Sequence, residues 1–242
     1  MTRFLASVRD AGEASLALHA GADIVDLKDP AKGALGALAP EAIAKCIAAV
    51  AARAEVSATA GDLPMDPEIV RAAVLNTAAA GVDYVKLGLF PGGDPEVCLD
   101  LLAELTQAVR VILVIFADAA PRFDALHKAA AIGATGVMLD TARKDGSSLR
   151  DHMPFERIAD FVAEARARGL LVGLAGALQA PDVPRLLPLK PDLIGFRGAL
   201  CRNGARGARL DAGACAAIRA LIPQEERGFA TAAAPRLAPS LC

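Results

Sequence analysis

The sequence contains no tryptophan, one tyrosine and only three histidines among its 242 residues. Its five cysteines are scattered, with no Cys-x-x-Cys pair and no histidine cluster near them. This pattern argues against structural zinc and suits reduced thiols in the cytosol. Because the histidines are equally dispersed, we expect neither a metal site nor a bound cofactor.

Long apolar runs are also missing, although hydrophobic residues make up 54% of the chain. No run approaches the ~20 residues of a membrane span, and the apolar stretch near Met1 is too short for a secretory signal. The formal net charge of -2 provides no broad basic surface for nucleic acid. We expect a cytoplasmic protein that binds neither nucleic acid nor membrane, and a homo-oligomer is compatible with the sequence.

Lysine is the scarcer strong base, with seven lysines against nineteen arginines. Where positive charge alone is needed, the sequence mostly uses arginine. A lysine at a strand end therefore indicates a need for an amine that can lose its proton, which arginine cannot do. Lys28 and Lys86 occupy such positions.

The hydrophobic pattern predicts eight strands that alternate with helices in one uninterrupted series. The predicted strands are Phe4–Val8, Ile24–Leu27, Glu55–Ala58, Tyr84–Leu87, Val111–Phe116, Gly136–Leu139, Leu170–Leu174 and Leu193–Phe196. This order favours a closed (β/α)8 TIM barrel, an α/β fold forming a single domain over residues 1–223. An open doubly wound sheet is the main alternative, but no Gly-x-Gly-x-x-Gly follows the first strand. The Ala- and Pro-rich residues 224–242 predict a disordered tail.

An internal repeat aligns the ends of alternate strands. Gly21–Val25 resembles Gly81–Val85, with looser copies at 133–137 and 191–194. In this register the inward positions are Asp26 and Lys28, Lys86 and Gly88, Met138 and Asp140, and Gly195 and Arg197. Because alternate strands of such a barrel share side-chain layers, we expect these positions to converge at the C-terminal mouth, where active sites of this fold lie.

Lys28, Lys86, Asp26 and Asp140 together suggest Schiff-base chemistry. A second cation and partial desolvation can lower the pKa of an amine from ~10.4 to ~7–8, which makes it nucleophilic toward an aldehyde or ketone. The two aspartates would move protons, and Lys144 in the following loop would bind an anion or assist proton transfer. The inert alternative pairs Lys28 with Asp26 and Lys86 with Asp140 as buried salt bridges.

Small residues after the last two strands favour a phosphate site, since their backbone N–H groups can approach an anion closely. They are Gly176 and Ala177, and Gly198, Ala199 and Leu200, which directly follow Arg197. Loop arginines 202, 206 and 209 could assist, although such residues more often face solvent. The expected partner is a small sugar phosphate.

Other polar residues near strand ends have ordinary local explanations beside a functional one. Asp10 is predicted to cap the first helix, with Glu13 at capping-box spacing. Residues that either line the mouth or form turns are Ser7, Thr59, Gly61, Asp62 and Asp118.

Five blocks of the chain resemble, in order, the signature blocks of (5-formylfuran-3-yl)methyl phosphate synthases. They are Asp23-Ile24-Val25-Asp26-Leu27-Lys28-Asp29-Pro30, Val56-Ser57-Ala58-Thr59-Ala60-Gly61-Asp62, Asp83-Tyr84-Val85-Lys86-Leu87-Gly88-Leu89, Met138-Leu139-Asp140-Thr141-Ala142-Arg143-Lys144-Asp145-Gly146 and Gly195-Phe196-Arg197-Gly198-Ala199-Leu200-Cys201. The blocks are spread in order over most of the stretch 3–222, so the match is specific.

The resemblance implies a lyase that joins two glyceraldehyde 3-phosphate molecules, expels phosphate and water, and forms a furan for methanofuran-type cofactors of one-carbon metabolism. It implies that Lys28 forms the Schiff base and Lys86 transfers protons, with Asp26, Asp140 and Lys144 in support. Two alternatives stay open: a class I aldolase that uses Lys28 on another sugar phosphate, and a non-catalytic sugar-phosphate-binding barrel.

Overall fold

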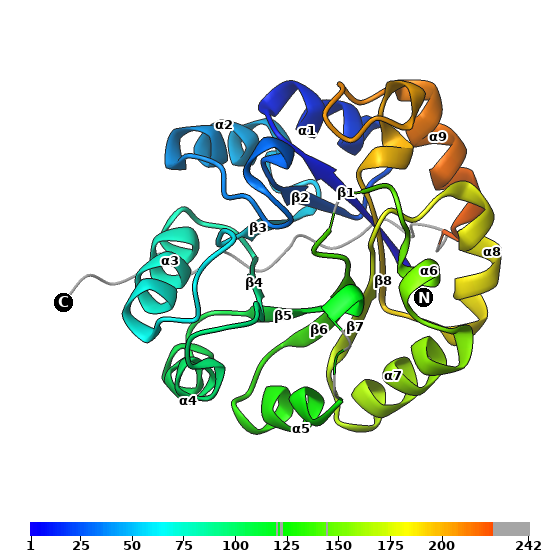
Figure 1. Ribbon diagram of the computed structural model, residues 1–242. Coiled ribbons are helices and arrows are strands. Elements are labelled where there is room, and N and C mark those ends of the chain that lie inside the picture. The colour runs from blue at the N-terminus through cyan, green and yellow to red at the C-terminus, as the bar shows by residue number, and fades with distance from the viewer. Residues whose placement is uncertain (120, 122, 144, 225–242) are drawn as a thin grey trace.

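The computed structural model describes residues 1–119, 121, 123–143 and 145–224. Within these residues, eight parallel strands close into a barrel in chain order. The strands are β1 (Arg3–Val8), β2 (Ile24–Leu27), β3 (Glu55–Thr59), β4 (Tyr84–Gly88), β5 (Val111–Phe116), β6 (Gly136–Asp140), β7 (Leu171–Leu174) and β8 (Leu193–Phe196). Figure 1 shows the ring of strands with the helices arranged around its outside. The predicted single-domain (β/α)8 barrel is confirmed.

Helices cover the outer face of the barrel. They are α1 (Ala11–His19), α2 (Pro40–Val50), α3 (Pro67–Ala79), α4 (Pro95–Leu105), α5 (Asp124–Ala131), α6 (Leu149–His152), α7 (Phe155–Ala167), α8 (Val183–Leu186) and α9 (Ala212–Leu221). Asp10 caps α1 by accepting from the Glu13 N–H, as its position predicts. The Glu13 carboxylate does not complete the capping box but accepts from the Arg9 N–H at 3.1 Å. The sequence pattern gave no sign of the four-residue α6.

The two faces of each strand contribute to different hydrophobic clusters, because successive side chains point to opposite sides of a sheet. Outward residues such as Val25 and Leu27 belong to the cluster packed against the helices. Inward residues form a second cluster inside the barrel, and Leu5, Ile24 and Tyr84 are among them. Two positions after these three, the same inner face carries polar side chains instead. The apolar interior therefore ends in a polar layer at the C-terminal mouth.

No helix in the described part of the chain is long and apolar enough to cross a bilayer. Across the same residues, no group of three or more His, Cys, Asp and Glu side chains is placed to hold a metal ion. Residues 225–242, most of the predicted disordered tail, lie outside the described residues, so that tail stays a prediction.

Candidate active site

Asp26 forms the centre of the polar layer and is fully buried at the end of β2. Its Oδ2 accepts hydrogen bonds from the Ser7 hydroxyl at 2.7 Å and pairs with Lys86 Nζ at 2.8 Å. Its Oδ1 accepts from the Ser57 hydroxyl at 2.7 Å. Burial alone would raise the pKa of Asp26, but attraction to Lys86 and Lys28 and hydrogen bonds from Lys86 and Ser57 hold that pKa below its ordinary value. Asp26 is therefore an ionised carboxylate at neutral pH.

The second amine, Lys28, lies just after β2 and is also nearly buried, with 6% of its surface exposed. Its Nζ lies 3.8 Å from Asp140 Oδ2, at the end of β6. Asp140 Oδ1 accepts from the Thr141 N–H at 2.7 Å, which fixes the orientation of the carboxylate. The structure thus pairs Lys28 with Asp140 and Lys86 with Asp26, an exchange of partners relative to the inert salt bridges considered from sequence.

Both amines open onto one cavity of about 380 Å³ at the C-terminal mouth of the barrel. Its volume falls in the range of roughly 300–1,000 Å³ that is usual for small-molecule sites. Lys28, Lys86 and Asp140 line this cavity, whereas Asp26 lies behind Lys86. The arrangement can present an amine to a carbonyl compound while carboxylates and a second amine stand close enough to exchange protons.

The predicted phosphate-binding residues divide into two groups. Gly176, Ala177 and Gly198 line the cavity together with part of Arg197. Ala199 and Leu200 do not: Leu200 is fully buried in the cluster beneath the helices, and Ala199 packs against that cluster.

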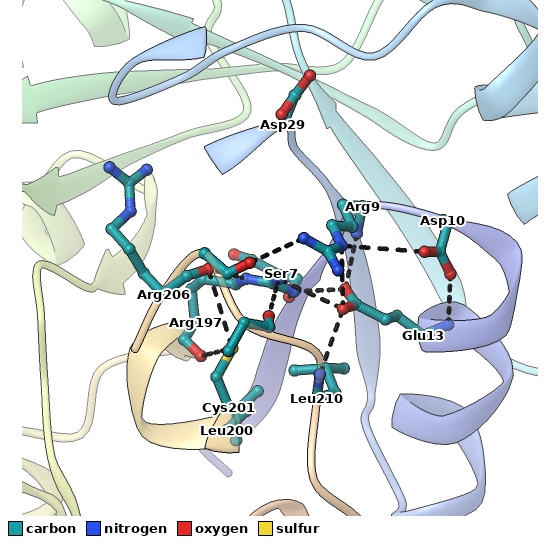
Figure 2. A network of polar contacts seen from close by, with 12 residues as sticks. Ser7, Arg9, Asp10, Glu13, Asp29, Arg197, Leu200, Cys201, Arg206 and Leu210 are labelled. Atoms are coloured by element: carbon teal, nitrogen blue, oxygen red, sulfur yellow. Dashed lines mark hydrogen bonds and ion pairs between the residues drawn. The ribbon is translucent and has the colours of Figure 1, made fainter. Parts of the chain in front are cut away.

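Arg197 has no donor left for a ligand. Its guanidinium pairs with Glu13 through both Nη atoms. It also donates to the backbone oxygens of Ser7 at 3.1 Å, Arg206 at 2.9 Å and Ala208 at 2.9 Å. These bonds use all five N–H groups of an arginine. Arg197 therefore holds loops together through the contacts drawn in Figure 2.

Three of the polar residues near strand ends hold loops in place. Asp62 accepts from the backbone N–H groups of Ala34 and Leu35. Asp118 accepts from the N–H groups of Ala142 and Arg143; burial raises its pKa, but these two backbone bonds outweigh that effect and lower it overall. The Thr59 hydroxyl donates to the backbone oxygens of Leu27 and Gly36. All three thus hold neighbouring backbone in place, and none of them lines the cavity.

Several cavity residues were not singled out from sequence. Ser147 lines the cavity, and its hydroxyl lies 2.7 Å from His152 Nε2 and also donates to Asp145. Arg206, which the sequence offered only as one of three loop arginines that could assist phosphate binding, also lines the cavity, from the loop after β8. For Ser147, the only signal in the sequence was the polar, glycine-containing composition of its loop, which is typical of a loop at the mouth of the barrel. Lys144, which was predicted to support the site, lies outside the described residues.

Comparison with known proteins supports a specific family. A family model described as 4-HFC-P synthase matches residues 4–219. The (5-formylfuran-3-yl)methyl phosphate synthase of Methanopyrus kandleri is 39% identical over 217 residues, covering 84% of this chain and 91% of the relative. The synthase of the same name from Methanococcus maripaludis strain C7 is 37% identical over 214 residues, with 84% and 91% covered. A protein of Methylorubrum extorquens, provisionally assigned the same name, is 44% identical over 209 residues, covering 86% of each chain.

Solved structures share the fold. Phosphoribosyl anthranilate isomerase from Thermus thermophilus superimposes with a TM-score of 0.65 at 20% identity, covering 91% of this chain and 98% of the isomerase. A 3-hexulose-6-phosphate synthase gives a TM-score of 0.62 at 17% identity, covering 92% and 100%. At such identities the likeness concerns the barrel alone.

Proposed function

This chain belongs to the 4-HFC-P synthase family, and from that membership we propose that it is a Schiff-base lyase. Its substrates are two molecules of glyceraldehyde 3-phosphate, and its product is (5-formylfuran-3-yl)methyl phosphate. The overall equation balances when one inorganic phosphate and two water molecules are released for each pair of triose phosphates. We place this reaction in the cytoplasm, in the biosynthesis of a methanofuran-type cofactor.

The observation that carries the proposal is the pair of buried amines at one cavity, each beside a carboxylate. The Lys28 amine attacks the carbonyl carbon of one triose phosphate, and loss of water gives an iminium. The iminium acidifies the neighbouring carbon, whose deprotonation gives an enamine that attacks the aldehyde of the second triose. Elimination of phosphate and water then forms the furan ring, and hydrolysis frees Lys28.

Proton transfer falls to the groups that surround Lys28. Because the pKa of Asp26 is held low, Asp26 is the ionised acceptor in its pair with Lys86. Lys86 thus donates protons to the reacting groups. The ionised Asp26 holds the Lys86 amine in position through the 2.8 Å contact. Asp140 Oδ2 lies 3.8 Å from Lys28 Nζ. Asp140 exchanges protons with the carbinolamine and the iminium that form at this nitrogen. Gly176, Ala177 and Gly198 offer backbone N–H groups to a substrate phosphate, and Lys144 keeps its predicted supporting role.

Borohydride trapping tests the proposal directly. Incubation with glyceraldehyde 3-phosphate and borohydride should leave a reduced adduct on Lys28, located by mass spectrometry of peptides. Released inorganic phosphate should appear in the same mixture without reductant. The matched variant K28R keeps the charge but loses the nucleophile, so it should form no adduct while its melting temperature stays close to that of the wild type.

The outcomes separate the alternatives. An adduct on Lys28 without phosphate release would indicate a class I aldolase. Absence of any adduct on Lys28 would refute the Schiff-base mechanism and favour a non-catalytic sugar-phosphate-binding barrel.

A further inference from the structure

Arg206 is a cationic side chain of the cavity wall with most of its donors unused. It lies in the loop after β8, is partly buried, and lines the cavity that also holds Lys28 and Lys86. Its Nη2 donates to the Gly33 backbone oxygen at 2.9 Å, and no second hydrogen bond joins the guanidinium to a described residue. Since a guanidinium carries five N–H donors, Arg206 can offer a planar fork of donors to a ligand.

The charge balance of the cavity also singles out Arg206. The other described cations of the wall face carboxylates, in the pairs Lys86–Asp26, Lys28–Asp140 and Arg197–Glu13. No described carboxylate lies within ion-pairing distance of Arg206. Burial lowers its pKa, and attraction from Asp140 and Asp62 offsets this only in part. A partly buried cation with no ion-pair partner among the described residues is stabilised by an anion bound in the cavity.

The backbone around Arg206 is rigidly held by the Arg197–Glu13 pair. Arg197 Nε donates to the Arg206 oxygen and its Nη2 to the Ala208 oxygen, both at 2.9 Å. Glu13 Oε1 accepts from the Leu210 N–H at 3.2 Å. Figure 2 shows the Arg206 side chain extending away from this network. The loop is therefore pre-organised, so little conformational entropy is lost when Arg206 binds a ligand.

From these contacts we propose that Arg206 binds the phosphate group of the sugar phosphate substrate. Its fork of donors matches the oxygens of a phosphate monoester, and it shares the cavity wall with Gly176 and Gly198. The inference rests on the proposed function for the identity of the substrate, but phosphate binding itself requires no Schiff base. Arg197 is then a positioning residue that presents Arg206.

Glycerol 3-phosphate is a suitable probe because it carries the phosphate group but has no carbonyl to react with lysine. Its affinity should be measured by calorimetry for the wild type, R206Q, R206K, and the matched controls R202Q and R209Q. Arg202 and Arg209 belong to the same loop but are exposed, so their variants change the charge equally without touching the cavity. R206Q should lose about 10- to 100-fold in affinity, as expected when hydrogen bonds to a charged group are removed. R206K should retain part of the affinity, and both controls should match the wild type.

A second measurement separates phosphate binding from a purely structural link between Arg206 and Gly33. Borohydride trapping with unphosphorylated glyceraldehyde should proceed equally in the wild type and R206Q. Equal losses for glyceraldehyde and glycerol 3-phosphate would overturn the proposal in favour of the structural link. Wild-type affinity in R206Q, or no measurable binding of glycerol 3-phosphate by the wild type, would also overturn it. If instead no carbonyl compound is trapped by any variant, the proposed function fails while the calorimetry still decides the role of Arg206.

Discussion

Replacement of Asp26 by asparagine should destabilise the barrel strongly while preserving its shape. The two side chains are nearly equal in size, so packing is kept, but Lys86 would remain 2% exposed without its counter-charge. Removal of one partner from a buried ion pair costs about 3–5 kcal/mol. For a chain of this size that corresponds to a fall in melting temperature of about 6–20 °C.

The double variant D26N/K86M supplies the control. Methionine removes the stranded charge and keeps an unbranched side chain, so the double variant should unfold at higher urea concentration than D26N alone. Urea titrations of the wild type, D26N, K86M and D26N/K86M, followed by circular dichroism at neutral pH, give the four free energies of the cycle. If D26N unfolds within about 1 kcal/mol of the wild type, the buried pair is not the stabilising element described above.

The same variant has a signature in acid. The folded-state pKa of Asp26 lies below the unfolded value of about 3.9, so its stabilising contribution is complete above that pH. The contribution is lost as the pH falls through the folded pKa, because the unfolded chain then binds the proton more readily. The wild type should therefore lose stability more steeply than D26N below about pH 4. Equal slopes would show that Asp26 has no lowered pKa.

Two further predictions concern other buried groups. E13Q should lower the free energy of unfolding by about 3 kcal/mol in urea titrations, because Arg197 would keep its burial but lose its counter-charge. E41Q, at an exposed position of α2, is the matched control, and equal stabilities would contradict the role given to Glu13. Burial raises the pKa values of Cys46 and Cys215 to about 11, so in a C242S background these thiols should react with Ellman's reagent at about pH 8 only after unfolding. Rapid labelling of either thiol in the folded protein would contradict that burial.

The convergence of charges could be predicted because it follows from local geometry. A spacing of two residues places Asp26 and Lys28 on one strand face whatever the rest of the fold. The repeat then relates their strand to the one that carries Lys86, and barrel closure brings alternate strands to a common layer. For this reason the fold and the meeting of amines with carboxylates were readable from the sequence.

The partner of each amine could not be predicted, since it depends on the stagger of tilted strands around the ring. Asp26 lies opposite Ser57 in the β2–β3 register, whereas Lys86 lies opposite Thr59 in the β3–β4 register. Because the strands are tilted, this offset of two residues across two strands keeps Asp26 and Lys86 in one layer, where their side chains meet. The period of two along a single strand carries no information about this offset.

Arg197 shows a different limit. Its partner Glu13 stands 184 positions earlier in the chain, and the local context of Glu13 suggested only a helix cap. Nothing within a short window of sequence distinguishes an arginine held by a distant carboxylate from one that awaits a ligand. Arg197 and Arg206 differ in how many of their N–H donors are already bonded to the protein, which depends on the folded structure.

The bond between α1 and the loop after β8 has a consequence for synthesis on the ribosome. Glu13 emerges early, yet the arginine that neutralises it and the Leu210 amide that it accepts from are translated near the end of the barrel. A nascent chain that stops short of β8 would leave Glu13 with Arg9 as its cation but without Arg197 and the Leu210 amide, so the final contacts of α1 form only later. Completion of the barrel and ordering of the loop after β8 are thus coupled, late in translation.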